Sequence, residues 1–200
     1  MKHAIWLITF CALLIWSAIN PHDRLTWVME ALPPMLGAVA VYYLILTDRA
    51  PTQLSFWLIL IHCVILIVGS HYTYAHVPLF DWLRDITDGS RNNYDKLGHL
   101  AQGFIPAILA REVLVRQNAV NGRFWLGFLV VCFCLAFSAF YEFIEWWAAL
   151  IMGGSAEQFL GMQGYVWDTQ SDMLCAAIGA IAALLLLSKI HDQQLAAKHY

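Results

Sequence analysis

The stretch NYDKLGHLAQGF, from Asn93 to Phe104, opens a strongly apolar segment but carries Asp95, Lys96 and His99 at its start. A charged residue within a bilayer is costly unless it faces the interior of a helix bundle and has a partner there. Asp95 and His99 are four residues apart, so they share one face of a helix. The stretch therefore predicts a membrane helix whose first turns line a polar site.

The composition of the whole chain agrees with a membrane protein. Of its 200 residues 60% are hydrophobic and only 12% are charged, and the mean hydropathy is +0.62. A soluble domain of this length has no interior large enough for so many apolar side chains. We predict an all-α fold, a polytopic transmembrane helix bundle that forms one domain over residues 1–200 and has the lipid bilayer as its partner. The net charge of -3 offers no basic patch, which argues against a nucleic-acid partner.

About six apolar segments are each close to the roughly 20 residues that cross a bilayer. The predicted spans are residues 4–20, 25–47, 54–70, 97–115, 124–150 and 168–188. If the N-terminus is cytoplasmic, most basic residues fall on the cytoplasmic side, as the positive-inside rule requires. They are Lys2, Arg49, Arg111, Arg116, Arg123, Lys189 and Lys198. An even number of spans then returns the C-terminus to the cytoplasm.

Acidic residues recur near the outer ends of these spans. Because successive spans alternate in direction, six acids on four spans lie at about the same depth, and His71 and Tyr72 end the third span at that level too. The six acids are Glu30, Asp95, Glu142, Glu145, Asp168 and Asp172. Asp168 and Asp172 are four residues apart, and Glu142 and Glu145 are three apart, so each pair shares a helix face. The pattern predicts one water-accessible acidic pocket.

Carboxylates combined with an imidazole suit a divalent cation, whose identity the sequence leaves open. The predicted metal ligands are Asp95, His99, Asp168, Asp172 and Glu142. Crowded carboxylates also supply a general acid or base, and the catalytic candidates are Glu142, Glu145 and Asp172. Lys96 and Arg91 are candidates for binding the anionic head group of a substrate.

Less specific interpretations exist for the same residues. Asp95 and Asp168 can be N-terminal helix caps. Glu142 and Glu145 can pair with Arg91 or Lys96 in a purely structural ion network. Among the histidines outside the pocket, we expect His62 to hydrogen-bond a neighbouring helix, and we assign no partner to His191.

Three motifs carry a family resemblance. RNNYDKLGHLAQGF, YEFIEWWAAL and GYVWDTQSDMLCAAIGA together resemble the YjdF-type inner-membrane proteins of bacteria over nearly the whole chain. That family is a domain of unknown function, so the resemblance implies a multi-pass protein of the bacterial inner (plasma) membrane and no particular activity. The stretch from Glu142 to Asp172 is also similar to VanZ-like membrane proteins, over too short a length to carry a function.

The leading functional hypothesis is hydrolysis or group transfer on a lipid-linked or otherwise amphipathic substrate at the acidic pocket. The glycine-rich connection at residues 152–168 is a candidate lid over it. The alternatives are a cation- or proton-coupled transporter of small molecules that uses the same acids, and a structural membrane protein with a charged network.

Overall fold

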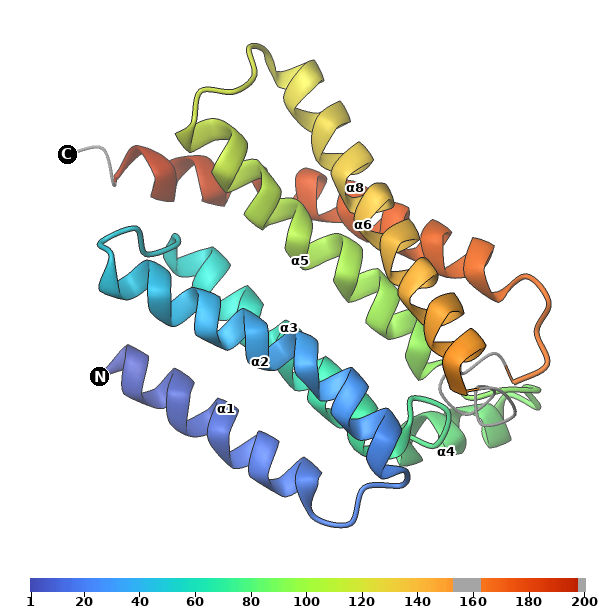
Figure 1. Ribbon diagram of the computed structural model, residues 1–200. Helices are drawn as coiled ribbons and strands as arrows, with labels where there is room; N and C mark the ends of the chain where they lie inside the picture. Colours follow the sequence, from blue (N-terminus) through green and yellow to red (C-terminus); the bar gives the residue numbers. More distant parts are fainter. Residues whose placement is uncertain (153–162, 198–200) are drawn as a thin grey trace.

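The protein is a bundle of helices, and the all-α prediction is confirmed. A computed structural model describes residues 1–152 and 163–197 (Figure 1), and within these ranges it contains helices and their connections but no strand. The helices are α1 (Lys2–Ala18), α2 (Arg24–Leu46), α3 (Gln53–Tyr72), α4 (Pro78–Ile86), α5 (Tyr94–Arg116), α6 (Arg123–Met152) and α8 (Asp168–Ala196).

Four of these helices, α2, α3, α6 and α8, are long and apolar enough to cross a membrane. The helix α1 has 17 residues, and α5 carries Asp95 and Lys96 near its start and Arg111 and Glu112 near its end. The count of about six spans therefore remains a prediction. Side chains on the outer surface are apolar, including Leu185, which is 80% exposed, and Val39, which is 67% exposed. Such a surface is suited to lipid rather than to water.

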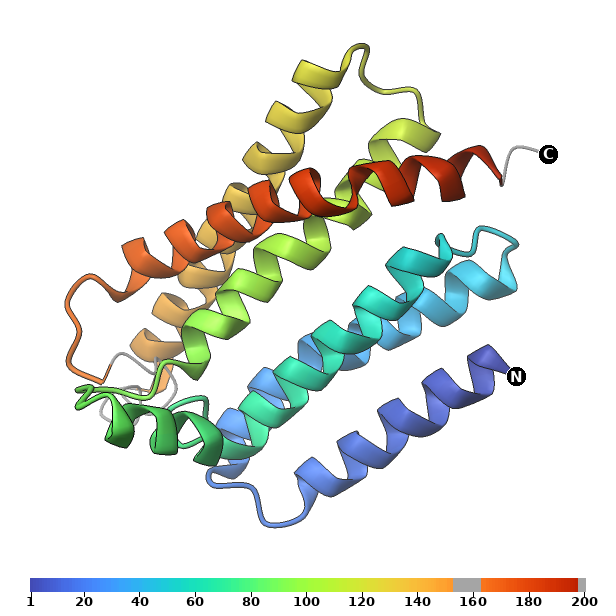
Figure 2. The same ribbon diagram turned by 180° about the vertical axis from the view of Figure 1, so that it is seen from behind.

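All helices except α4 run up and down the bundle in alternation, so both termini lie at the same end (Figures 1 and 2). We call the end where α1 begins and α8 ends the terminal end. The opposite end, where α5 and α8 begin, is the acidic end. The predicted alternation of helix direction is present, whereas the assignment of the two ends to the outer and inner sides of the membrane stays a prediction.

The bundle has two halves, one formed by α1, α2 and α3 and the other by α5, α6 and α8. In the first half, Trp6 and Phe10 stack at 5.5 Å and pack on Phe56, and the Trp6 indole donates a hydrogen bond to the Phe56 carbonyl at 3.0 Å. In the second half, Ile105 and Ile108 of α5 form the core with α6 and α8. The halves meet where α3 packs on α5.

The two helices in closest contact are α5 and α8, and glycine makes this contact possible. A Cβ atom added to Gly103 would lie 1.8 Å from the carbonyl oxygen of Ala176, and one added to Gly179 would lie 2.1 Å from that of Leu100. Both distances are far inside van der Waals contact. Small residues allow backbones to approach in this way, which is a common basis of helix association in membranes.

Two local features were only partly visible in the sequence. The helix α2 is capped by Asp23, whose carboxylate accepts a 2.7 Å hydrogen bond from the Thr26 backbone N–H. This bond lowers the pKa of Asp23 below its usual value. The short helix α4 lies between the predicted spans at residues 54–70 and 97–115, where no helix was predicted. Pro78 stands in its first turn. Asn92 holds α4 by donating to the Val77 carbonyl and to Asp81, both at 3.0 Å.

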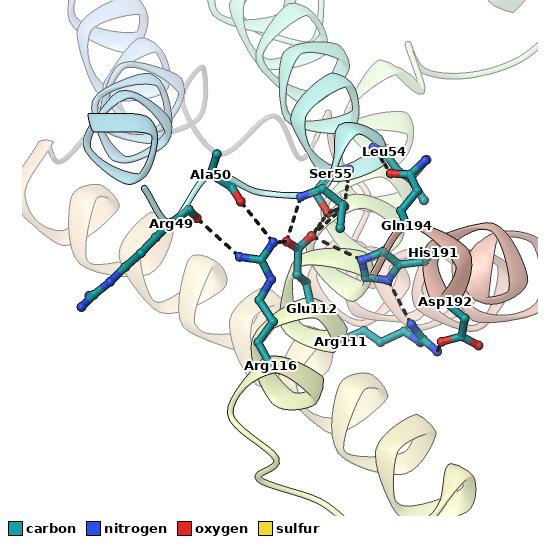
Figure 3. A network of polar contacts seen from close by, with 11 residues as sticks. Arg49, Ala50, Leu54, Ser55, Arg111, Glu112, Arg116, His191, Asp192 and Gln194 are labelled. Carbon is teal, nitrogen blue, oxygen red and sulfur yellow. Dashed lines mark hydrogen bonds and ion pairs between the residues drawn. The ribbon is translucent and has the colours of Figure 1, made fainter. Parts of the chain in front are cut away.

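A buried polar network joins three helices at the terminal end (Figure 3). The carboxylate of Glu112 on α5 accepts hydrogen bonds from the Thr52 backbone N–H at 2.8 Å and from the Ser55 hydroxyl at 2.5 Å. It also pairs with Arg116 at 2.7 Å. From α8, the Nε2 of His191 lies 3.3 Å from the same carboxylate.

The interpretation of His191 as a residue without partners is therefore wrong. Its side chain is fully buried, and its Nδ1 lies 3.0 Å from the Arg111 guanidinium. Since a guanidinium only donates, Nδ1 must accept and Nε2 must carry the proton that is donated to Glu112. His191 is thus a neutral bridge between α5 and α8, and we call this network of Thr52, Ser55, Arg111, Glu112, Arg116 and His191 the terminal clamp.

We predict that Gly103→Ala destabilises the fold by at least about 3 kcal/mol, because the new methyl group meets backbone that cannot move aside as a side chain can. Thermal unfolding of the purified protein in detergent measures the effect. Gly37→Ala on α2 is the matched control, since nothing lies within 4 Å of the added Cβ. Equal melting temperatures for the two variants would contradict the close packing of α5 on α8.

For the terminal clamp we predict that Glu112→Gln lowers the free energy of unfolding by roughly 3 kcal/mol, because Arg116 and the buried His191 lose their charged acceptor. Asp48→Asn is the control at the same end, because Asp48 is exposed and its positive φ of 56° suits asparagine. A Glu112→Gln variant as stable as the control would show that the network does not hold the helices together.

Candidate acidic site

Close packing of α5 on α8 brings together the polar residues at the start of both helices. On α5 these are Asp95, Lys96 and His99, and on α8 they are Asp168 and Asp172. Asp95 and His99 on α5 are four residues apart, as are Asp168 and Asp172 on α8, so each pair projects from one face of its helix. The convergence expected from the sequence is present, and Arg91, just before α5, joins it.

Ion pairs connect the two helices. Arg91 pairs with Asp168, and both side chains are almost completely buried. Lys96 Nζ lies 3.4 Å from Asp172 and 3.6 Å from Asp168, and it donates a hydrogen bond to Ser171. The ring of Tyr165 also lies 5.0 Å from Lys96 Nζ. Arg91 and Lys96 thus already have acidic partners, but the pairs observed are with Asp168 and Asp172, whereas the structural-network alternative expected Glu142 and Glu145 in that place.

Asp95 and Asp168 are not the N-cap residues of α5 and α8, although both lie in the first turn of their helix, where the helix dipole favours an acid. The N-cap positions of α5 and α8 are held by Asn93 and Trp167, and neither makes a side-chain capping bond. Asp168 instead points to Arg91, and Asp95 lies 3.5 Å from the Nε2 of His99 and 3.7 Å from Arg91. Both aspartates therefore contact other side chains and do not serve as N-cap residues.

Three of the predicted metal ligands form a compact group. Asp95, His99 and Asp172 each offer a ligand atom, and these atoms all lie within 4.8 Å of one another. His99 and Asp172 are 4% and 2% exposed, so the group is shielded from solvent. Such a group of two carboxylates and one imidazole is of the kind that holds a divalent cation.

Unpaired polar atoms lie beside this group. Over the described part of the chain, His99 Nδ1 and Glu142 Oε1 are buried without a hydrogen-bond partner. The Glu142 carboxylate approaches His99 Nε2 only to 3.9 Å, which is too long for a hydrogen bond. Buried polar atoms of this kind are costly unless a further group binds them.

Glu30 and Glu145 lie at the side of the site that faces the first half of the bundle. With Asp95 and His99 they line the polar end of a groove whose cavity volume is about 800 Å³. Glu30 accepts a 3.0 Å hydrogen bond from the Tyr141 hydroxyl of α6. Tyr141 was not among the predicted site residues, because a tyrosine beside an acidic run carries no signal of its own in a membrane helix.

Other predicted features lie elsewhere. His71 does not reach the acids, because its Nδ1 lies 2.9 Å from the Ser17 carbonyl and its ring packs on Trp16 at the end of α1. His62 was expected to hydrogen-bond a neighbouring helix, but its Nε2 has no partner among the residues that the structure describes. The candidate lid falls largely on residues 153–162, outside the described residues.

Comparison with known proteins gives a family but no activity. Residues 2–193 match the family described as "Predicted membrane protein (DUF2238)". The chain is 49% identical to "Inner membrane protein YjdF" of Escherichia coli (strain K12) over 189 residues, which cover 94% of this chain and 90% of that protein. No solved structure matches the chain.

We predict that Asp168→Asn destabilises the protein by roughly 3 kcal/mol, because the buried Arg91 guanidinium loses the charge of its nearest acidic partner. Asp85→Asn, in the exposed pair with Arg84, should cost less than about 1 kcal/mol. The Asp85 side chain is 66% exposed, so water already solvates that pair. Thermal unfolding in detergent compares the two variants, and a loss no greater for Asp168→Asn would argue against a buried pair.

Proposed function

The chain belongs to the DUF2238 family of membrane proteins, and on this premise we propose that it is a bacterial inner-membrane protein with a metal-dependent acidic site at the periplasmic face. Both termini then lie in the cytoplasm, and the count of six spans is part of the proposal. Arg49, Arg111 and Arg116 at the terminal end support this orientation through the positive-inside rule.

The observation that carries the proposal is the approach of Asp95, His99 and Asp172 to within 4.8 Å. Ligand atoms on opposite sides of a small cation lie up to roughly 4.2 Å apart, since each metal–ligand distance is about 2.1 Å. Three ligands of one cation cannot all be opposite one another and lie roughly 3.0–3.6 Å apart on average, so a pair near the 4.8 Å limit must close by about 1 Å to complete the site. Glu142 is a further ligand candidate through its unpaired oxygen. Asp168 is a weaker candidate because Arg91 holds it.

The charge of the site also supports a bound cation. Asp95, Glu142, Asp168 and Asp172 are four carboxylates within one cluster, and Arg91 and Lys96 supply only two fixed positive charges to it. Even a protonated His99 leaves this cluster short of one positive charge. Burial makes such an imbalance costly, and either protonation of a carboxylate or a bound divalent cation would remove it.

A divalent cation at this position polarises a phosphoryl or acyl group and activates water. We propose hydrolysis or group transfer on a lipid-linked or amphipathic substrate. A water oxygen, or the hydroxyl of an acceptor, bonds to the phosphoryl or acyl centre, and the bond to the leaving oxygen breaks. Glu142 and Glu145 take up the proton of the attacking group and return one to the leaving oxygen, while Lys96 and Arg91 bind the anionic head group.

A purely structural network is the second candidate. It is favoured by the pairing of Arg91 with Asp168 and of Lys96 with Asp172, which ties α5 to α8 without any ligand. A cation- or proton-coupled transporter is less well supported, because its binding site is expected near the middle of the membrane, whereas these acids lie at one end.

We predict that the purified protein, loaded with Mg²⁺, Mn²⁺ or Zn²⁺ and desalted, retains a stoichiometric amount of one of them. His99→Asn and Asp172→Asn should each lower the retained metal at least roughly tenfold, because each removes a ligand from a site with few others. Elemental analysis by mass spectrometry makes the measurement.

Asp192→Asn is the control, since Asp192 pairs with Arg111 at the terminal end and its side chain is 50% exposed. The variants must unfold cooperatively for the comparison to count. A wild-type protein that retains none of the three ions would overturn the metal site, and variants that lose stability but no metal would favour the structural network.

A further inference from the structure

The groove that begins at the acidic site continues along the bundle between its two halves. Its floor is formed by α3 and α5, and its walls by α2 and α6. We propose that this groove holds the hydrocarbon tail of a lipid phosphate whose tail is longer than one leaflet of the bilayer, of the polyprenyl type, with the phosphate at the acidic end. The position of the head group rests on the proposed function, whereas the position of the tail does not.

The lining of the groove changes from polar to apolar along its length. Glu30, Asp95, His99 and Glu145 line one end. Beyond Gln102 on α5, the lining is apolar apart from His62, with Leu109 and Val113 on the floor and Phe133 on the wall. Ligand sites commonly have this design, in which a few polar groups fix one end of an otherwise apolar molecule.

The length of the groove argues for a long tail. Its floor runs along α5 from Asp95 to Leu114, which is about 28 Å at 1.5 Å per residue. The hydrocarbon core of a bilayer is about 30 Å thick, so one leaflet contributes only about 15 Å. A phospholipid acyl chain anchored at the acidic end is shorter than this groove even when fully extended, so it would leave the far end of the groove unfilled. The cavity volume of about 800 Å³ lies within the range of ligand sites.

The groove opens onto the apolar outer surface of the bundle, which favours a lipid as its occupant. In Figure 1 α2 and α6 lie in front of α3 and α5, and in Figure 2, which is seen from behind, α3 and α5 lie in front. Leu129, Phe133 and Phe137 of the α6 wall are each between 39% and 49% exposed, so apolar side chains extend from the groove to the outer surface. A tail can thus enter sideways from the membrane without crossing a polar barrier.

Glycine provides a direct way to fill the groove. Gly37 lies in the α2 wall, and a Cβ atom added there meets nothing within 4 Å. Gly37→Phe should place a ring in the space of the tail without disturbing the helix. Leu36→Phe is the matched control, since Leu36 is the preceding residue, 60% exposed on the outer surface. Ala136→Phe fills the groove from the α6 wall and guards against an unexpected effect at Gly37.

The probes are undecaprenyl phosphate, undecaprenol and dioleoyl phosphatidic acid, each added to purified protein in detergent and measured by native mass spectrometry. We expect wild-type protein to retain both undecaprenyl lipids over the phosphatidic acid. Gly37→Phe and Ala136→Phe should weaken their binding at least about tenfold, which is a change of about 1.4 kcal/mol. Leu36→Phe should bind as wild type does. The metal content of every variant is measured in parallel.

Either of two results would overturn the tail site. One is equal binding of all three lipids, and the other is that the Gly37→Phe and Ala136→Phe variants bind the undecaprenyl lipids as well as the control does. Neither result touches the metal site, which is judged by metal content alone. If undecaprenol and undecaprenyl phosphate bind equally and no metal is retained, the tail site stands while the phosphate position and the proposed function fail.

Discussion

The contact between the backbones of α5 and α8 determines where the polar residues of this protein lie. At Gly103 and Gly179 the helices approach so closely that a methyl group would overlap a carbonyl oxygen of the partner helix. A contact of this kind fixes the rotation of both helices about their axes. Once these rotations are set, residues one or two turns before Gly103 must face the first turns of α8. Asp95, Lys96 and His99 therefore meet Asp168 and Asp172 without any contribution from the connecting loops.

The same contact has a second polar cluster at its other end. Arg111 and Glu112 on α5 meet His191 on α8, so the apolar and glycine-rich middle of the pair lies between two charged ends. The two clusters differ in how well they are satisfied. The terminal clamp gives the Glu112 carboxylate several close donors, whereas the acidic end leaves buried atoms of His99 and Glu142 without partners. A buried network whose polar atoms all have hydrogen-bond partners suits a structural role, whereas buried polar atoms without partners suit a binding role.

Much of the acidic site could be predicted from the sequence. Spacings of three and four residues and the alternation of spans place Asp95, His99, Asp168 and Asp172 together, and the structure brings them together. The terminal clamp was not found in this way. Glu112 and Arg116 are four residues apart and pair on one face of α5, but nothing in the sequence connects Glu112 with His191, 79 residues away on α8. Its partners Thr52 and Ser55 are ordinary polar residues at a helix start. The spacing of charged residues in the sequence identifies the acidic site, whereas the packing of the helices is needed to identify the terminal clamp.

Glycine positions illustrate the same limit. Gly37 on α2 and Gly103 on α5 both lie inside helices, and the sequence does not distinguish their roles. In the structure, Gly103 is filled by a neighbouring backbone while Gly37 faces open space in the groove. The difference arises from which helix lies opposite, and that depends on contacts distant in the chain.

The groove and the acidic site are physically linked through Glu30. Most acids of the site belong to the half of the bundle formed by α5, α6 and α8, but Glu30 comes from α2 in the other half. Its hydrogen bond with Tyr141 of α6 crosses the polar end of the groove and ties one wall to the other. A molecule that spreads α2 from α6 must strain or break this bond. Only an occupant that moves these two walls apart would therefore alter the surroundings of Asp95 and His99, and through this bond a tail far from the charged groups could affect the site at which its head group binds.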